Sequence, residues 1–270
     1  MRFFIEISYK GSSLFGWQIQ KKNLSIQETI ETCLSFLLKK KIKIIGAGRT
    51  DTGVHAIQMF AHFDLTFDLT FDLTFDLTFD LTFDLTFDLT KNHINNHFKS
   101  KLNSFLPLNI KIINIFSVKK NIHARFNAIS RVYEYRISLS KDPFLFQTSW
   151  QWLSKNQIEL KILKKGANIL KKYKDFSSFC KEKSKKNLCE ISTAKWILKK
   201  NILYFRIEAN RFLRNMVRSL VGTLIELGIK KITIKDFIKI IEAKNRNLAG
   251  ITAPAKGLFL IKINYPLNIF

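Results

Sequence analysis

The fold is organised around one loop, which reads Gly46-Ala47-Gly48-Arg49-Thr50-Asp51-Thr52-Gly53-Val54-His55-Ala56. The apolar run 42–45 precedes this loop and the run 57–63 follows it, so we expect a strand, a tight turn and another strand. Three glycines within eight residues let the backbone turn sharply and approach a ligand closely. The stretch therefore predicts a strand-end loop that presents its polar side chains.

Arg49 and Asp51 are the charged residues of this loop, and their spacing of two points both side chains the same way in extended chain. An ionised carboxylate on such a loop can act as a nucleophile or as a base. A polar turn with a surface ion pair explains the same spacing, and spacing alone favours that structural interpretation. Other parts of the chain have to decide between the two.

Several segments resemble one family. The run from Arg49 to Ala56 resembles the signature of the tRNA pseudouridine synthases of the TruA family. Four more segments resemble the same family, and they span Tyr9 to Gln18, Leu102 to Pro107, Asp175 to Cys180 and Phe212 to Arg218. The resemblance therefore covers nearly the whole chain apart from the repeat described below.

The resemblance implies roles for six residues. Asp51 matches the catalytic aspartate, the expected nucleophile, and Arg218 matches the arginine that pairs with it. The expected substrate contacts are Tyr133, Arg49, Arg125 and Leu258, of which Leu258 packs near the flipped uracil and the two arginines grip the RNA backbone. Whether Asp51 attacks C6 of the base or assists at the sugar stays open.

The implied reaction is the isomerisation of uridine to pseudouridine in the anticodon stem-loop of tRNA, at positions 38, 39 and 40. The resemblance also implies a homodimer, a cytoplasmic enzyme, and an intramolecular transferase that needs no cofactor and no metal. Two alternatives remain: a non-catalytic RNA-binding or chaperone protein on the same fold, and a decaying enzyme damaged by the repeat. A paired-carboxylate hydrolase is disfavoured, because no second acid lies near Asp51 in the sequence.

Composition agrees with a polyanionic partner. The 270 residues include 45 Lys and Arg against 21 Asp and Glu, a formal net charge of +24. Nucleic acid is the first partner that such a charge suggests, and an anionic membrane surface is the second. No apolar run reaches about 18 residues, so we expect no transmembrane helix. The cysteines, Cys33, Cys180 and Cys189, lack the spacing of metal ligands and are expected to be reduced thiols.

The order of elements predicts an α+β fold. In the first half we expect strands at 3–9, 42–45, 57–63 and 110–118, and helices at 26–38, after a Ser25–Glu28 capping box, and 94–105. In the second half we expect strands at 131–137, 191–198 and 202–209, a last strand near 258, and helices at 161–173, 210–228 and 233–243. The expected fold is two ferredoxin-like β-α-β-β-α-β-type halves with antiparallel sheets and the active-site cleft between them. The expected domains are 1–116 and 117–270.

Residues 63–90 repeat Phe-Asp-Leu-Thr seven times. A four-residue unit is too short for a solenoid, and its alternation of apolar and polar residues is typical of a strand. We expect an insert without chemistry, shaped as a long strand or hairpin.

Three segments have two interpretations each. Trp17, on a glycine-rich loop, suits base stacking or burial under the sheet. The tyrosines of strand 131–137 suit a stacked base or simple cross-strand packing. A stripe of Arg211, Arg214 and Arg218 on helix 210–228 suits an RNA contact or a solvated face.

Overall fold

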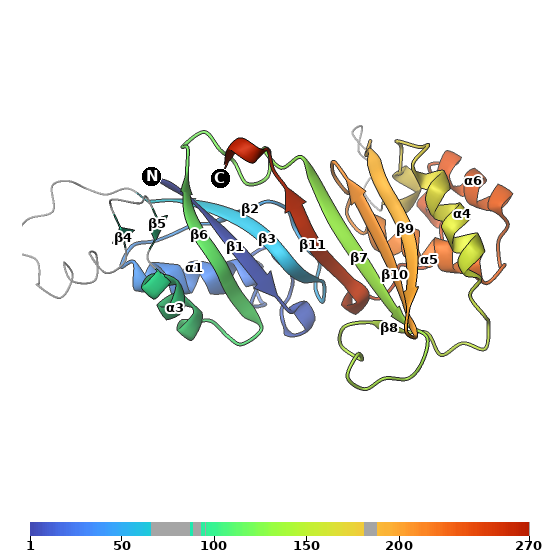
Figure 1. Ribbon diagram of the computed structural model, residues 1–270, viewed down its shortest axis with the longest axis horizontal. Helices are drawn as coiled ribbons and strands as arrows, with labels where there is room; N and C mark the ends of the chain where they lie inside the picture. Colours follow the sequence, from blue (N-terminus) through green and yellow to red (C-terminus); the bar gives the residue numbers. More distant parts are fainter. Residues whose placement is uncertain (66–86, 89–92, 95, 181–187, 270) are drawn as a thin grey trace, which may run out of the picture. The chain divides into compact units, whose positions relative to one another are not determined.

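The computed structural model describes residues 1–65, 87–88, 93–94, 96–180 and 188–269 and divides into two compact units (Figure 1). Unit 1 holds Met1–Ala128 together with Tyr265–Phe270, and unit 2 holds Ile129–Asn264. Each unit combines helices with a mostly antiparallel sheet, so the expected α+β class is confirmed. The domain boundary after residue 116 stays a prediction.

Unit 1 is built on a three-stranded antiparallel core with a short fourth strand. Its elements are β1 (Arg2–Tyr9), the 3-10 turn η1 (Gly11–Ser13), α1 (Ile26–Leu37), β2 (Ile45–Gly46), β3 (His55–Asp64), β4 (Phe87–Asp88), β5 (His93–Ile94), α3 (Asn96–Phe105), β6 (Ile110–Val118) and the 3-10 turn η5 (Leu267–Ile269). Strand β1 is central and pairs with β6 on one side and β3 on the other, while β2 pairs with β3. The two strands β4 and β5 pair with each other.

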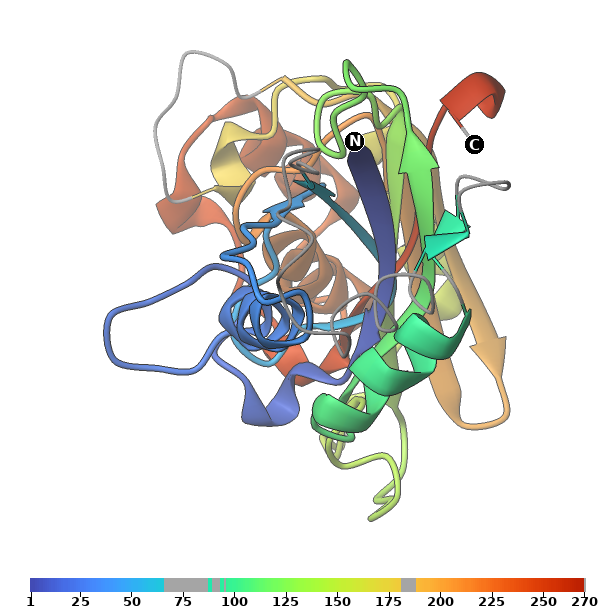
Figure 2. The same cartoon turned by 90° about the vertical axis from the view of Figure 1, so that its left-hand side faces the viewer.

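Helix α1 begins where its cap predicts. The Ser25 hydroxyl accepts a hydrogen bond from the Glu28 backbone N–H at 3.2 Å. Figure 2 shows α1 almost end-on beside β1. Helix α3 packs against β6 and touches α1, where the rings of Phe36 and Phe105 lie 5.3 Å apart. Helix α3 begins at Asn96, two residues later than expected, because Ile94 belongs to β5.

The predicted strand 42–45 is wrong except at its end, since strand β2 contains only Ile45 and Gly46. Ile42 and Ile44 are buried as expected, but their backbone N–H groups donate to side chains of α1. The partners are the Ser35 hydroxyl at 2.9 Å and the Glu31 carboxylate at 2.9 Å. The backbone N–H groups of this apolar run thus find hydrogen-bond acceptors on side chains of a helix and not on a neighbouring strand.

The described residues of unit 2 combine a four-stranded antiparallel sheet with three helices. Its elements are β7 (Ser130–Ser138), β8 (Trp150–Gln151), α4 (Leu160–Leu170), the 3-10 turn η2 (Ser177–Phe179), β9 (Ile191–Lys199), β10 (Ile202–Ala209), α5 (Met216–Gly228), α6 (Ile234–Glu242), the 3-10 turns η3 (Arg246–Leu248) and η4 (Ala255–Gly257), and β11 (Leu258–Asn264). The antiparallel order is β11-β7-β10-β9, and β8 adds a short parallel pairing to β7. Helix α4 packs against β9 and α5, and α6 contacts both helices.

Helix α5 is shorter than predicted, because it begins at Met216 and not at Asn210. Asn215 has a φ of 61°, a left-handed conformation that cannot continue a helix toward its N-terminus. The predicted helical stripe of Arg211, Arg214 and Arg218 is therefore wrong, since only Arg218 lies on the helix.

A glycine at the end of a predicted helix commonly forms a left-handed cap. Gly228 is instead the last residue of α5, and Lys230 takes the positive φ, at 61°. A Cβ at 228 would lie 2.7 Å from a methyl carbon of Leu163, so a larger residue there would force the Leu163 side chain to shift. The predicted strands 191–198 and 202–209 are confirmed as β9 and β10, which form an antiparallel hairpin with a φ of 45° at Lys200 in its turn.

The three cysteines are free thiols, as expected. In the part of the chain that the structure describes, no helix is both long and apolar enough to cross a membrane. Most of the Phe-Asp-Leu-Thr repeat, with its expected strand or hairpin, lies outside the described residues, which include only residues 63–65 and 87–88 of it.

Candidate active site

Asp51 lies in a tight turn between β2 and β3. The Val54 backbone N–H donates to the Asp51 carbonyl oxygen at 3.1 Å and closes the turn. Gly53 has a φ of 80°, which favours glycine strongly over any other residue. The side chain of Asp51 is half-buried. The turn expected from the glycines is therefore confirmed.

The backbone before Asp51 rests on the segment after η1. The Trp17 backbone N–H donates to the Thr50 carbonyl at 3.1 Å, and the hydroxyls of Thr50 and Tyr9 lie 2.8 Å apart. Gly16 has a φ of 80°, and a Cβ on it would lie 2.7 Å from the Thr50 carbonyl oxygen. Only glycine allows this approach, so the two loops fit together backbone to backbone.

The backbone after Asp51 is anchored in the same way. The Gly11 backbone N–H donates to Nδ1 of His55, a buried residue at the start of β3, at 3.1 Å. A Cβ on Gly11 would lie 2.1 Å from the Val54 carbonyl oxygen. Asp51 is thus held from both sides by residues about 40 positions earlier in the chain.

Trp17 is buried, with 2% of its surface exposed, so the structure favours the packing interpretation over base stacking. Its indole fills the space beside Gly46, where a Cβ would lie 2.6 Å from the ring. The indole therefore supports the start of the Asp51 loop from below.

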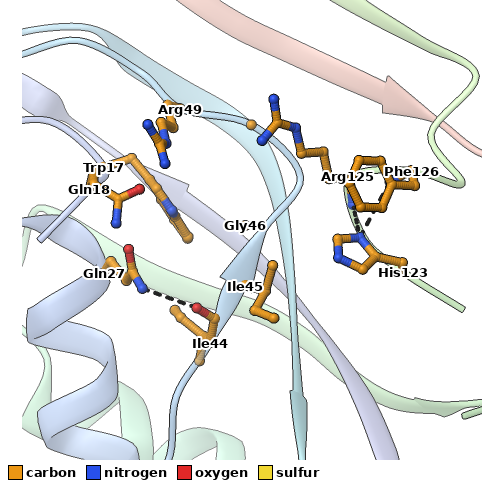
Figure 3. A pocket seen from close by; sticks show the side chains of 11 residues that line it. Trp17, Gln18, Gln27, Ile44, Ile45, Gly46, Arg49, His123, Arg125 and Phe126 are labelled. Carbon is orange, nitrogen blue, oxygen red and sulfur yellow. Dashed lines mark hydrogen bonds between the residues drawn. The ribbon is translucent and has the colours of Figure 1, made fainter.

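An open pocket of about 240 Å³ adjoins this loop (Figure 3). It is lined by Trp17, Gln18, Gln27, Ile44, Ile45, Gly46, Gly48, Arg49, His123, Arg125 and Phe126. Arg49 comes from the Asp51 loop and Arg125 from a distant segment, so the fold brings two of the expected RNA contacts together. Gln27 is fixed, because its amide donates to the Ile44 carbonyl at 3.1 Å and to the Glu31 carboxylate at 2.8 Å.

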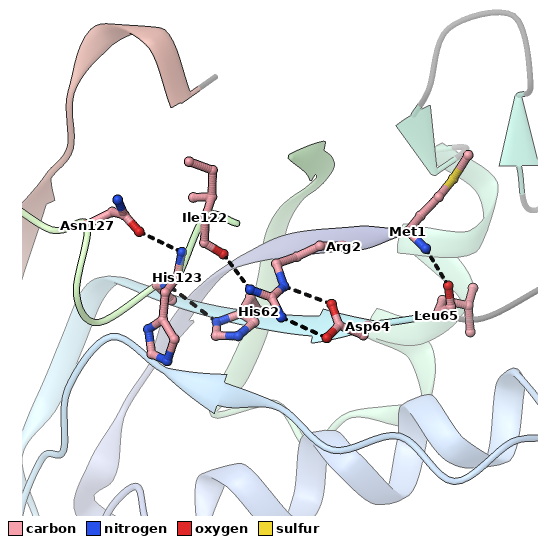
Figure 4. A network of polar contacts seen from close by, with 9 residues as sticks. Met1, Arg2, His62, Asp64, Leu65, Ile122, His123 and Asn127 are labelled. Atoms are coloured by element: carbon pink, nitrogen blue, oxygen red, sulfur yellow. Dashed lines mark hydrogen bonds and ion pairs between the residues drawn. The ribbon is translucent and has the colours of Figure 1, made fainter. Parts of the chain in front are cut away.

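Residues 122–127, here named the pocket loop, include Arg125, which lines the pocket. Figure 4 shows the polar contacts that hold the start of this loop. Arg2 on β1 grips Asp64 on β3 through two hydrogen bonds of 2.8 Å each. A third donor of the same guanidinium reaches the Ile122 carbonyl at 2.9 Å. This fork holds the start of the pocket loop against the sheet, and it lowers the pKa of the Asp64 carboxyl.

Two histidines fix the rest of the pocket loop. The Ala124 backbone N–H donates to Nδ1 of His62, a buried residue of β3, at 3.2 Å. Nδ1 of His123 accepts from the backbone N–H groups of Arg125 and Phe126 at 3.0 and 3.4 Å. The two imidazole rings lie edge to face, 4.6 Å apart. Both Nδ1 atoms act as acceptors, so the loop requires both rings to be neutral.

Arg218 lies in the first turn of α5 in unit 2. Its Nε donates to the Ala253 carbonyl at 2.7 Å, and one terminal nitrogen donates to the Asn215 amide oxygen at 3.3 Å. Asn215 can reach Arg218 because its left-handed backbone turns the chain immediately before the helix. These two hydrogen bonds therefore hold the Arg218 guanidinium in one orientation.

The segment that receives Arg218 is itself braced by a second arginine. Arg246 donates to the carbonyls of Ala249 and Gly250 at 3.2 and 3.1 Å and to the Thr252 hydroxyl at 2.7 Å. Three donors of one planar group thus fix the chain just before Ala253.

Tyr133 and Leu258 lie on neighbouring strands of unit 2. The half-buried ring of Tyr133 meets the ring of Phe212 edge-on, with centroids 5.1 Å apart. Leu258 is buried, begins β11 and pairs in register with Tyr135. The Tyr135 hydroxyl donates to the Pro254 carbonyl at 2.7 Å, and burial raises its pKa, so it stays a donor.

The comparisons with known proteins agree on one family. A family model described as tRNA pseudouridine synthase matches residues 173–266. The tRNA pseudouridine synthase A of Azobacteroides pseudotrichonymphae is 44% identical over 271 residues, covering 100% of this chain and 98% of that protein. The chain belongs to the tRNA pseudouridine synthase family. Two more relatives have the same name. The protein from Bacteroides fragilis is 40% identical and covers 100% of this chain and 98% of its own length. The protein from Borreliella afzelii is 36% identical and covers 96% of this chain and 97% of its own length.

Membership of the tRNA pseudouridine synthase family confirms the resemblance and the assignment of the chain as an isomerase of this class. Of the six expected site residues, Asp51, Arg49 and Arg125 belong to unit 1, and Tyr133, Arg218 and Leu258 belong to unit 2. Their individual roles stay predictions. Among the described residues, no cluster of three His, Cys, Asp or Glu is arranged to hold a metal ion.

Sequence reasoning missed four residues around the pocket: Gln27, Phe126, His62 and His123. For His62 the available signal was a polar side chain inside the apolar strand 57–63. His123 and Phe126 lie close to Arg125 in the sequence. A family motif does not show which neighbours of a matching residue contact the substrate and which only hold the loop in place. Their tasks depend on partners far away in the sequence, and only the folded chain shows those partners.

The neutral state of His62 makes stability depend on pH. Burial, and then the positive charge of Arg2, lower its pKa from 6.5 to about 4. Because the folded pKa is lower, the unfolded chain binds the proton first, so stability is complete above pH 6.5 and is lost as pH falls toward 4. We expect this residue to remove roughly 2 kcal/mol between pH 7 and pH 5.

The measurement is urea denaturation of the wild type and His62→Asn at both pH values. The asparagine amide oxygen can accept the Ala124 hydrogen bond but does not titrate, so His62→Asn should lose less stability at pH 5 than the wild type does. An equal loss in both proteins would contradict the assignment.

Proposed function

We propose that this chain isomerises uridine to pseudouridine in the anticodon stem-loop of tRNA, at positions 38, 39 and 40, with Asp51 as the nucleophile. The observation that carries the proposal is the Asp51 turn. Its backbone is held on both sides by the chain from Tyr9 to Trp17, and Arg49 beside it lines a pocket with a second arginine. The relatives are tRNA pseudouridine synthases by name, which supports tRNA as the substrate.

The reaction rearranges one nucleoside. The bond between C1′ and N1 breaks, the uracil turns, and a bond between C1′ and C5 forms, while C5 loses a proton and N1 gains one. The target base has to leave the stem-loop stack before Asp51 can reach it. The carboxylate attacks either C6 of the base or C1′ of the sugar, and both routes use the same residue.

Arg218 is proposed to aim the Asp51 carboxylate and keep it ionised. A guanidinium stays charged and can grip a carboxylate through two parallel hydrogen bonds. The hydrogen bonds from Arg218 to Ala253 and Asn215 support this role, because they hold the guanidinium group in place. Tyr133 is proposed to stack on the uracil and to serve proton transfer at C5, and Leu258 to form an apolar wall beside the base.

The finer architecture is part of the same proposal. Apart from the short strands β4, β5 and β8 and the extra helix α6, each unit runs strand, helix, strand, strand, helix, strand. In that series the first strand lies between the third and the last, which supports two ferredoxin-like halves. Asp51 and Arg218 belong to different units, so the mechanism requires a cleft that domains 1–116 and 117–270 both line. The homodimer is proposed from the family resemblance, and the cytoplasmic location from that resemblance together with the expected reduced cysteines.

The test is to incubate the protein with unmodified tRNA transcripts and to map pseudouridine at each position. We expect modification at positions 38, 39 and 40 wherever a uridine stands there, and none in transcripts that carry cytidine instead. Binding without any pseudouridine would favour the non-catalytic RNA-binding alternative. Pseudouridine elsewhere in the tRNA would refute the anticodon-loop specificity while leaving the reaction intact.

A further inference from the structure

Phe126 has no part in the roles assigned so far, yet its ring lies in the pocket with 76% of its surface exposed. Removing such a large apolar surface from water is favourable, so a ligand that covers the ring would gain binding free energy. Its ring lies 4.4 Å from that of His123, and the Arg125 guanidinium lies 5.9 Å from its centroid. The pocket therefore presents an exposed aromatic ring beside a cationic group.

Hydrogen bonds hold the pocket loop, which carries Phe126, in place before any ligand binds. Arg2 donates to the Ile122 carbonyl, His62 accepts from the Ala124 N–H, and the Tyr265 hydroxyl donates to the Ala124 carbonyl. The backbone groups on both sides of the pocket loop's turn are thus tied to β1, β3 and the chain end. A ligand that stacks on Phe126 does not have to order the loop, which favours binding.

We propose that the pocket loop is a base-stacking platform, on which the Phe126 ring takes an unpaired base of the RNA while Arg49 and Arg125 take the neighbouring phosphates. His62 is a positioning residue in this arrangement, because it acts on the RNA only through Ala124 and the loop. The proposal rests on the proposed function for the identity of the RNA, and it adds a nucleotide contact to the uridine site.

Charge favours RNA over another protein as the occupant. The chain carries a net charge of +24, so a second copy would bring like charge to Arg49 and Arg125. An RNA strand brings both complements of the pocket, an aromatic base and an anionic backbone. The volume of about 240 Å³ is smaller than the roughly 300–1,000 Å³ of sites that enclose a whole small molecule, as expected for one nucleotide of a longer ligand.

The experiment compares tRNA binding of Phe126→Ala, Phe126→Tyr and Arg125→Gln over a salt series from about 50 to 200 mM. Phe126→Ala should raise the Kd about 5- to 150-fold without changing the salt dependence, since stacking releases no counterions. Arg125→Gln should lower the slope of log K against log salt by about one. Phe126→Tyr keeps the ring and should restore most of the binding.

Phe144→Ala is the matched control, because that ring is 93% exposed on a loop of unit 2 and should leave the Kd unchanged. His62→Leu removes the acceptor of Ala124 and should weaken binding, while His62→Asn should rescue it. If His62 acts by presenting Phe126, the double variant His62→Leu/Phe126→Ala should bind little worse than Phe126→Ala alone.

A Kd for Phe126→Ala within about twofold of the wild type would overturn the proposal. It would also fail if Phe126→Ala changed the oligomeric state in sedimentation, since the ring would then contact a second copy. Neither result bears on Asp51, whose role is decided by pseudouridine formation.

Discussion

Asp51→Asn is expected to lower the rate of pseudouridine formation by at least about 10⁴-fold and to leave the Kd for tRNA nearly unchanged. The amide has almost the same size but carries no charge and is a poor nucleophile. The turn should survive the exchange, because Val54 donates to the backbone carbonyl of residue 51 and Gly16 packs on the backbone of Thr50. Single-turnover kinetics and filter binding at one salt concentration measure the two quantities separately.

Asp236→Asn is the matched control for this substitution. Its exposed carboxylate accepts hydrogen bonds from the N–H and hydroxyl of Thr233 at the start of α6, so the exchange should cost little stability and no activity. If Asp51→Asn kept the wild-type rate, the nucleophile would have to be another group. If it instead lost tRNA binding, Asp51 would be a binding or structural residue.

Arg218→Lys is expected to lower the single-turnover rate about 10²- to 10³-fold, with a much smaller change in tRNA binding. Lysine keeps the positive charge but cannot donate at once to Ala253, to Asn215 and to a carboxylate in one plane. The loss should therefore appear in the chemical step. The measurement is the rate at saturating protein, which removes any weakened binding from the comparison.

Arg206→Lys provides the control, because Arg206 also donates two hydrogen bonds, to the buried carboxylate of Glu134 on β7. This pair lies in unit 2 but has no proposed part in the reaction, so the rate should remain near that of the wild type. Equal rates for Arg218→Lys and the wild type would show that the charge alone suffices. A large loss in both variants would point to a general disturbance of unit 2.

Elements that depend on neighbours in the chain were predictable. Ser25 caps α1 through a residue three positions on, and Thr233 and Asp236 cap α6 in the same way. The hairpin of β9 and β10 turns within a few residues at Lys200. Such contacts are short-range, so composition and spacing contain all of their partners.

The candidate site was predictable only as a set of residues. The motif around Asp51 and the matching positions of Arg218 and Tyr133 carried the family assignment, which the comparisons confirm. The sequence left base stacking and burial of Trp17 both open, and neither the motif nor the hydrophobic pattern indicated that Phe126 is presented to solvent. Burial of a side chain depends on the residues that pack against it in the folded chain, and those residues are distant in the sequence.

The sequence by itself determined the family, the α+β class, most helices and strands, and the identity of the proposed nucleophile, because local propensity and a long motif are written in consecutive residues. Only the tertiary structure decided that Ile42 and Ile44 satisfy their backbone on α1, that α5 begins after Asn215, and that His62 holds the pocket loop. The physical reason is the same in each case. A backbone hydrogen bond takes whichever partner the fold brings within reach, and for His62 and Ala124 that partner lies 62 residues away.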